Sequence, residues 1–387
     1  RSCLAACRAL GATVEEEEHD GVEAWRVYGT GGSPGTPENV IDVGNSGTTL
    51  RLVASAAALA PGYTVLTGDY QIRRRPMEPL LKALKDLGAT AFSTRPGGRP
   101  PVAIAGPFKG GSTRLEGLTS QYVSSLLLTA PLATEPVTID VVRLNEQPYV
   151  EMTLQYLRAQ DIQIDYEDLH HYEIAPGQRY RGMEWTVPAD YSSATFFIVA
   201  AAVLKQSRVV LLGLDPDDVQ GDKAVIDMLR RMGADIAWDT RDGRPALVVS
   251  CRGLQGGEFD LNATPDALPA LAVAGAVAEG ETRLTNVPQA RVKECDRIEA
   301  MCTELRKMGV DIAELDDGLV IRKSGLRGAT LDGHDDHRVV MALAVAAMAA
   351  DSETFVESAE AIDVTFPDYI DLMTSLGGAL RLVEEGM

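Results

Sequence analysis

The charged run Arg291 to Ile298 (RVKECDRI) carries the side chains of the sequence best placed to do chemistry. It follows a turn-like NVPQA segment, and its spacing predicts a helix start with Lys293 and Glu294 in the first turn and Arg297 beyond them. Helix starts expose free N–H groups and a partial positive charge, so they favour anions. An amphipathic surface helix would carry similar charges, so the run alone only suggests a functional site.

Helix starts of a second kind recur along the chain. Five small or polar clusters, each with Ser, Thr or Asp where an N-cap belongs, begin at Gly44, Thr119, Asp190, Thr264 and Asp335. Each precedes a helix that is apolar on nearly all faces and is therefore expected to be buried. These clusters could be ordinary caps on core helices. If several converge, their N–H groups would form an anion site inside an acidic protein.

An internal repeat explains this regularity. A helix, a Leu-Gly or Met-Gly pair, a strand, a turn and a second strand recur, and the residues expected to end the helices are 68 to 77 positions apart: Gly11, Gly88, Asp161, Gly233, Gly309 and Gly377. This period suits a βαβ-type unit with an extra helix. Six units predict two domains of three. The irregular segment near Trp185 to Pro188 places the boundary between domains 1–187 and 188–387.

Composition limits the classes of function. The chain has 387 residues, of which 45% are hydrophobic, and a formal charge of −20, which argues against nucleic-acid binding. No apolar run predicts a membrane span, so we expect a soluble protein. Five cysteines without a CxxC pair favour buried thiols in a reducing cytoplasm. The spacing of His334 and His337 is common at helix starts, so we expect no metal site there.

Taken together, the motifs resemble those of the 5-enolpyruvylshikimate-3-phosphate (EPSP) synthase family. The resemblance rests on GNSGTTLR (44–51), GDYQIRRRP (68–76), TSQ (119–121), PDA (265–267), RVKECDR (291–297), DHR (336–338) and TFPDY (365–369). It covers essentially the whole chain. It implies an α/β (α+β) fold of two similar domains, each of three repeated βαβαββ-type units with buried helices, and an active site in the interdomain cleft.

The resemblance also implies an activity and the residues that perform it. Members of the family transfer the enolpyruvyl group of phosphoenolpyruvate to the 5-hydroxyl of shikimate 3-phosphate, in the shikimate pathway of aromatic amino acid biosynthesis, and need no cofactor. By motif, Asp266 and Glu294 would be catalytic. Phosphoenolpyruvate would be bound by Gly47, Arg75, Gln121, Arg297 and Arg338, and shikimate 3-phosphate by Thr119, Ser120, Gln121, Tyr149, Asp266, Gln289 and Lys293. Arg51 would orient the glycine loop. We expect a monomer that binds neither nucleic acid nor membrane.

The sequence departs from the family pattern in three places. Family members begin with a loop whose lysine, serine and arginine contact both substrates, and this segment does not precede Arg1. If the chain as given is the mature protein, we expect it to be inactive or nearly so. Glu146 stands where a serine commonly meets the shikimate phosphate, and a carboxylate there should repel it. Val364 replaces a lysine found in many members.

Two other functions remain open on the sequence. The missing segment and Glu146 would suit a catalytically silent homologue that binds anionic metabolites without turnover. The enolpyruvyl transferase that acts on UDP-N-acetylglucosamine shares the fold. That family usually has a reactive cysteine in the loop that here reads GDYQIRRRP, which contains none.

Overall fold

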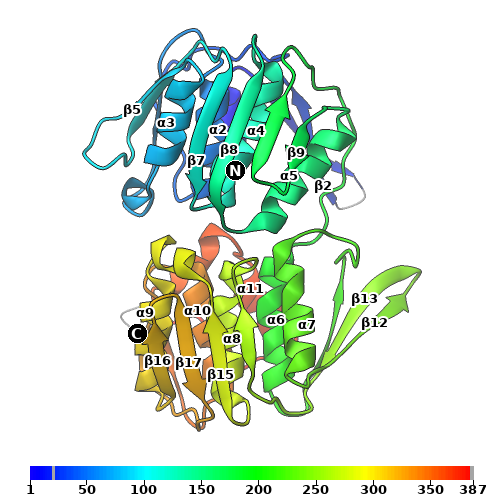
Figure 1. The fold of residues 1–387 in the computed structure, drawn as a ribbon. Coiled ribbons are helices and arrows are strands. Elements are labelled where there is room, and N and C mark those ends of the chain that lie inside the picture. Colours follow the sequence, from blue (N-terminus) through cyan, green and yellow to red (C-terminus); the bar gives the residue numbers. More distant parts are fainter. Residues whose placement is uncertain (20–21, 384–387) are drawn as a thin grey trace. The chain divides into compact units, whose positions relative to one another are not determined.

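The chain forms two compact units, Arg1–Trp185 and Thr186–Met387, each with its own hydrophobic core (Figure 1). The computed structural model describes residues 1–19 and 22–383. The division falls two residues before the predicted boundary at 187. None of the helices in these described residues is both long and apolar enough to cross a membrane.

The first unit contains two complete repeats after a partial one. The partial repeat is α1 (Ser2–Ala9) with the antiparallel pair β1 (Thr13–His19) and β2 (Val22–Tyr28). The complete repeats are β3 (Ile41–Asp42), α2 (Gly47–Ala57), β4 (Thr64–Thr67), η1 (Ile72–Arg74), α3 (Glu78–Asp86), β5 (Thr90–Ser93) and β6 (Val102–Ala105), then β7 (Gly111–Gly117), α4 (Ser120–Thr129), η2 (Ala130–Leu132), β8 (Val137–Leu144), α5 (Gln147–Ala159), β9 (Asp165–Glu167) and β10 (His171–Ile174).

The second unit has one complete repeat between two partial ones. The first partial repeat is α6 (Tyr191–Val203), β11 (Arg208–Leu212), η3 (Gly221–Lys223), α7 (Ala224–Arg231), β12 (Asp235–Arg241) and β13 (Arg244–Ser250). The complete one is β14 (Glu258–Asp260), η4 (Pro265–Ala267), α8 (Leu268–Val277), β15 (Glu281–Thr285), η5 (Pro288–Val292), α9 (Arg297–Lys307), β16 (Asp311–Leu315) and β17 (Gly318–Arg322). The last is β18 (Thr330–Asp332), α10 (His337–Met348), β19 (Phe355–Glu357), η6 (Ala359–Val364) and α11 (Tyr369–Ser375).

The complete repeats share one topology. Their sheets have the orders β3-β4-β6-β5, β7-β8-β10-β9 and β14-β15-β17-β16, with the first pair parallel and the others antiparallel. The predicted α/β fold of repeated units is confirmed. Because the loops after two parallel strands emerge at the same sheet edge, each repeat brings two helix starts together.

Buried helices form the centre of each unit. In the second unit, α8 packs on β15 and β17 and also against α6 and α10, which explains why its side chains are buried on all faces (Figure 1). In the first unit, α4 contacts α2, α5 and β7. Helices whose sequences are apolar on every face are therefore the ones that lie between other elements of the fold.

The six predicted helix ends are confirmed by backbone geometry. The backbone angle φ lies between 87° and 100° at the five glycines, Gly11, Gly88, Gly233, Gly309 and Gly377. At their counterpart in the third repeat, Asp161, φ is 57°. Each lies one residue past the C-cap of its helix, in the left-handed conformation that glycine adopts without strain. After α3, the N–H groups of Gly88 and Ala89 donate to Lys85 and Leu84, as in a Schellman motif.

Replacing Gly233 with alanine is expected to lower the free energy of unfolding by about 1 kcal/mol, because a Cβ at positive φ is strained. An added Cβ would meet only the Gly253 carbonyl, at 3.5 Å, so the cost is conformational rather than a clash. Urea unfolding measures it. The control is Gly325→Ala, where a Cβ meets nothing within 4 Å; an equal loss in both variants would contradict this explanation.

Two details of the predicted helix starts were wrong. Helix α9 begins at Arg297 with Asp296 as its N-cap, so Lys293 and Glu294 lie in the preceding loop rather than in the first turn. Thr264 precedes the short helix η4 and donates to Asp222 instead of capping α8. In the other four clusters a Ser, Thr or Asp side chain caps the helix as expected: Ser46, Thr119, Asp190 and Asp336.

Candidate functional site

In the first unit, the glycine loop before α2 is fixed by the loop that follows β4. Asn45 Nδ2 donates to Asp69 Oδ2 at 2.6 Å, and the Asp69 N–H donates to the Gly44 carbonyl at 3.0 Å. Both loops leave the parallel strands β3 and β4 at the same edge. The GNSGTTLR and GDYQIRRRP motifs, 24 residues apart at Asn45 and Asp69, thus form one structure.

Arg51 joins this loop to the start of α4. Its Nη1 donates to Gln121 Oε1 at 2.6 Å, Gln121 Nε2 donates to Thr48 Oγ1 at 2.8 Å, and the guanidinium lies over the Tyr122 ring. A Cβ added to Gly47 would lie 3.1 Å from Arg51 Nη1, so the glycine admits the guanidinium beneath the loop. The geometry fits the predicted orienting role of Arg51.

Arg75 lies close to this group. It follows η1 and is 5% exposed, and its charge is among the influences that lower the pKa of Arg51, after burial itself. Gly47, Arg75 and Gln121, three of the residues predicted to bind phosphoenolpyruvate, are therefore gathered in one part of the first unit. Two cations and the N–H groups at the starts of α2 and α4 make that part suitable for an anion.

The start of α4 holds the residues predicted to bind the shikimate phosphate, and Glu146 contacts them. Glu146 Oε2 accepts hydrogen bonds from Thr119 Oγ1 at 3.0 Å, Ser120 Oγ at 3.0 Å and Ser120 N at 3.2 Å. Tyr149, half-buried in the first turn of α5, donates its N–H to the Glu146 carbonyl at 3.1 Å. Thr119, Ser120 and Tyr149 are thus neighbours.

In the second unit, one guanidinium holds both predicted catalytic carboxylates. Arg297 is 1% exposed; its Nη1 lies 2.7 Å from Asp266 Oδ1 and its Nη2 lies 2.5 Å from Glu294 Oε2. Its Nε lies 2.8 Å from Asp336 Oδ2. These acids come from the starts of α8, α9 and α10, so the helix starts do converge within this unit. The carboxylates raise the pKa of Arg297 against the effect of burial, and it stays charged.

Asp266 has two further cationic neighbours. Arg338 Nη2 lies 3.1 Å from Asp266 Oδ2, and Lys293 Nζ lies 3.7 Å from Asp266 Oδ1. Burial alone would raise the pKa of Asp266, but Arg338, Lys293 and Arg297 hold it well below its ordinary value. Asp266 is therefore a carboxylate at neutral pH, fit to accept a hydrogen bond.

Gln289 is a buried polar residue of the same unit. Its Nε2 donates to the Asn262 carbonyl at 3.0 Å, while its buried Oε1 has no hydrogen-bond partner within the described residues. A buried acceptor without a partner is rare and calls for a water or a ligand. Gln289 lies in η5, four residues before Lys293.

Three residues of this cluster were not predicted as site residues. Asp336 holds Arg297 and caps α10, and Ser192 Oγ accepts from Arg338 Nη2 at 3.0 Å. Ser192 in turn donates to Asp190 Oδ2 at 2.8 Å. Their motifs, DHR and DYSS, were recognised as helix starts. The sequence signal was therefore present, but it could not show which side chains face Arg297 and Arg338.

His334 and His337, the histidines of the GHDDHR segment, are held within the fold. Burial lowers the pKa of His337 to about 4, so its imidazole is neutral, and His334 Nε2 lies 3.1 Å from Glu304 Oε1. No group of three or more His, Cys, Asp or Glu side chains in residues 1–19 and 22–383 is arranged to hold a metal ion.

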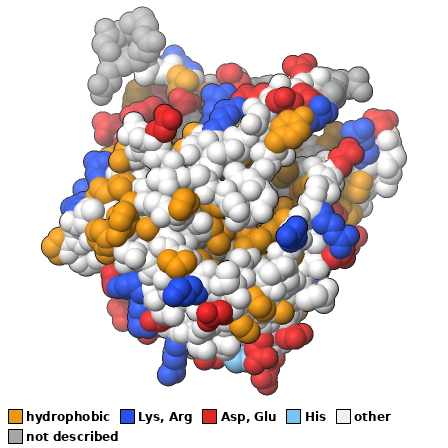
Figure 2. Space-filling model, turned by 90° about the horizontal axis from the view of Figure 1, so that it is seen from above, with side chains coloured by type: hydrophobic (Ala, Val, Ile, Leu, Met, Phe, Trp, Pro, Cys, Tyr) orange, Lys and Arg blue, Asp and Glu red, His pale blue; other side chains and the backbone are white. Residues whose placement is uncertain are grey.

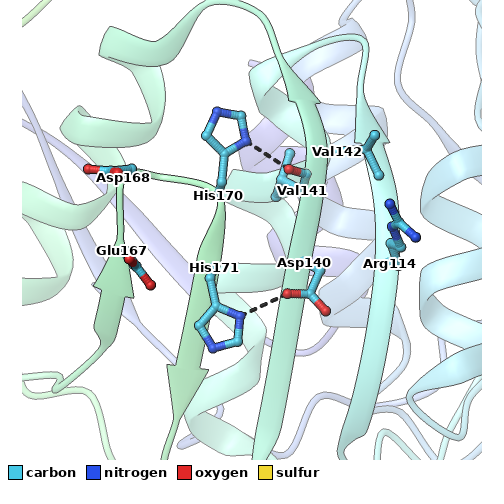
Figure 3. A pocket seen from close by; sticks show the side chains of 8 residues that line it. All are labelled: Arg114, Asp140, Val141, Val142, Glu167, Asp168, His170 and His171. Atoms are coloured by element: carbon cyan, nitrogen blue, oxygen red, sulfur yellow. Dashed lines mark hydrogen bonds and ion pairs between the residues drawn. The ribbon is translucent and has the colours of Figure 1, made fainter.

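A surface hollow of about 490 Å³ lies on the β7-β8-β10-β9 sheet, apart from these clusters (Figure 3). His171 Nδ1 there lies 2.8 Å from Asp140 Oδ1, and His170 Nδ1 lies 2.7 Å from the Val141 carbonyl, so the two histidines are engaged with β8. None of the residues predicted to bind substrate lines this hollow.

Charged side chains of both signs occur on the face of the molecule in Figure 2. On the face in Figure 2, Lys and Arg side chains are interspersed with Asp and Glu and with hydrophobic side chains. Such a surface lacks the concentrated positive charge that a nucleic-acid backbone requires. That face therefore gives no support to nucleic-acid binding.

The repeated units and the two carboxylates on one guanidinium define an α/β enzyme that handles anionic substrates. The family model for EPSP synthase (3-phosphoshikimate 1-carboxyvinyltransferase) matches residues 1–373. The chain is 50% identical to the 3-phosphoshikimate 1-carboxyvinyltransferase of Ruminiclostridium cellulolyticum over 97% of this chain and 87% of the relative. It is also 50% identical to that of Acetivibrio thermocellus, over 99% and 88%.

Solved structures agree with the sequence relatives. EPSP synthase from Acinetobacter baumannii matches with a TM-score of 0.81 and 29% identity, covering 99% of this chain and 88% of that one. The chain belongs to the EPSP synthase family. The resemblance read from the motifs is thereby confirmed.

Proposed function

We propose that this protein transfers the enolpyruvyl group of phosphoenolpyruvate to the 5-hydroxyl of shikimate 3-phosphate, releasing phosphate. The proposal rests on the Arg297 guanidinium, which contacts both Asp266 and Glu294 in a member of the EPSP synthase family. The reaction supplies a precursor of the aromatic amino acids in the shikimate pathway.

The chemistry needs an acid and a hydrogen-bond acceptor. The substrate oxygen bonds to C2 of phosphoenolpyruvate while a proton is added to its methylene carbon; later a proton leaves that carbon and the C2–O bond to phosphate breaks. In this proposal Glu294 gives and retrieves the carbon-bound proton. Asp266 accepts the hydrogen of the 5-hydroxyl.

Arg297 and Arg338 link substrate binding to the state of Asp266. Both guanidinium groups contact Asp266 and help to keep its pKa low. A substrate carboxylate that takes hydrogen bonds from either arginine would weaken that hold, so the pKa of Asp266 rises and it becomes a better proton acceptor. Binding of phosphoenolpyruvate therefore prepares Asp266 for the attacking hydroxyl.

The remaining predicted residues bind the substrates. Gly47, Arg75 and Gln121 hold the phosphate of phosphoenolpyruvate. Thr119, Ser120 and Lys293 hold the shikimate phosphate, Tyr149 faces its ring, and Gln289 Oε1 accepts a substrate hydroxyl. The buried Oε1 without a partner in the described residues supports the last assignment.

The protein acts in the cytoplasm as a monomer without a cofactor, and it binds neither nucleic acid nor membrane. Its five cysteines are all free, as suits a reducing compartment. Light scattering of the purified protein tests the monomer; a molecular mass of twice 41.5 kDa would contradict it.

The activity is tested by measuring inorganic phosphate release from phosphoenolpyruvate. Release is expected from the chain preceded by a family-like N-terminal segment, and only when shikimate 3-phosphate is also present, whereas the chain alone should release little. Replacement of shikimate 3-phosphate by UDP-N-acetylglucosamine should give none. Binding of both substrates by a folded protein without release would instead indicate a silent homologue.

A further inference from the structure

The start of α4 is already occupied by an anion that the chain itself supplies. A single oxygen, Glu146 Oε2, accepts from Thr119 Oγ1, Ser120 Oγ and Ser120 N, at 3.0 to 3.2 Å. Glu146 is 4% exposed. Hydroxyl and N–H donors at a helix start are the donors that a phosphate oxygen would use.

The backbone holds Glu146 in this place. Glu146 has φ 58° at the N-cap of α5, a conformation uncommon for a residue with a side chain. The preceding residue ties its loop to α4, because Asn145 Nδ2 donates to the Leu118 carbonyl at 3.2 Å. Since β7 and β8 are parallel, the two loops meet at the same sheet edge. The contact thus follows from the topology of the repeat.

We propose that Glu146 competes with the phosphate of shikimate 3-phosphate for Thr119 and Ser120 and thereby sets the affinity for that substrate. The inference rests on the proposed function. Each donor group has one hydrogen to give, so the phosphate can use all three only after the carboxylate has moved away. A carboxylate that stayed nearby would also repel the phosphate. Glu146 is therefore an affinity-determining residue, not a catalytic one.

Substrate chemistry provides a control. Unphosphorylated shikimate has the same ring and carboxylate but no phosphate, so its binding does not depend on the helix start. Replacing Glu146 should improve binding of shikimate 3-phosphate and leave that of shikimate unchanged. The discrimination between the two ligands, rather than overall affinity, reports the role of Glu146.

The test compares wild type with Glu146→Ser, Glu146→Gln and the control Glu151→Ser by titration calorimetry. Glu151 is exposed on the same helix α5. Glu146→Ser is expected to bind shikimate 3-phosphate about tenfold more tightly, which corresponds to about 1.4 kcal/mol. Glu146→Gln keeps the volume and removes the charge, so a smaller gain is expected. Glu151→Ser should match wild type.

Equal or weaker binding of shikimate 3-phosphate by folded Glu146→Ser and Glu146→Gln would overturn the proposal. So would an equal gain for shikimate. Inorganic phosphate separates this failure from failure of the proposed function. If no form releases phosphate from phosphoenolpyruvate, the proposal still requires inorganic phosphate to raise the melting temperature of Glu146→Ser more than that of wild type. An equal rise in the melting temperatures of wild type and Glu146→Ser would contradict the proposal.

Discussion

Replacing Arg297 with methionine is expected to lower the free energy of unfolding by about 3–5 kcal/mol at pH 7, because it leaves buried carboxylates without their shared cation. Asp336 is fully buried and Glu294 is 14% exposed at its side chain. Chemical denaturation measures the loss. The control is Arg306→Met on the same helix, where an exposed arginine donates to the Ile312 carbonyl at 3.0 Å. The expected cost of this substitution is about 1 kcal/mol.

The difference in the free energy of unfolding between wild type and Arg297→Met is expected to become smaller in acid. Asp266 has a folded-state pKa well below 3.8, so in wild type it contributes stability above that value and loses it as the pH falls through the folded pKa. Arg297→Met lacks part of this contribution already at pH 7. If the difference in unfolding free energy stays constant from pH 7 to pH 3, lost packing rather than uncompensated charge causes the effect.

Replacing Glu294 with glutamine is expected to reduce kcat by about 10²- to 10⁴-fold, because the amide cannot deliver a proton to carbon. Glutamine keeps an oxygen that can accept from Arg297, so the fold and the melting temperature should change little. Initial rates of phosphate release, measured on the chain preceded by a family-like N-terminal segment with and without the substitution, give the effect. This prediction rests on the proposed function.

Glu299→Gln is the matched control. Glu299 lies in the first turn of α9 and is exposed, so its replacement removes the same charge from the same helix start. It should retain at least about half of the wild-type rate, since exposed substitutions away from special features have small effects. Similar losses in both variants would show that Glu294 acts through the local field and not as a proton carrier.

Repetition made the fold predictable. Leu-Gly and Met-Gly pairs identified the helix ends from Gly11 to Gly377, because only the left-handed conformation at that position selects glycine so strongly. Apolar runs on all faces identified the buried helices. Short helices were harder to place: Thr264 resembles an N-cap, but its hydroxyl bonds Asp222 and a short η4 intervenes before α8.

The motifs named residues that the structure brings together, but they did not show the contacts between these residues. The motifs named Asp266, Glu294, Arg297 and Arg338, yet nothing in their spacing showed that Arg297 is buried among three carboxylates. Such pairing depends on which way side chains point from three separate helix starts. Glu146 was recognised as a conflict with a phosphate, but its contact with Thr119 and Ser120 depends on the adjoining loops after β7 and β8.

The shared strand order of the complete repeats bears on how such a protein arises. Duplication of one ancestral gene segment would give every copy the same buried helix and the same pair of loops at one sheet edge. Afterwards the helix bodies are constrained by packing, while the helix starts are free to diverge. The corresponding helices of the repeats have different N-cap residues: Ser46, Thr119, Asp190 and Asp336. New ligand preferences could thus evolve by single substitutions at these positions, as Glu146 illustrates, without a new core.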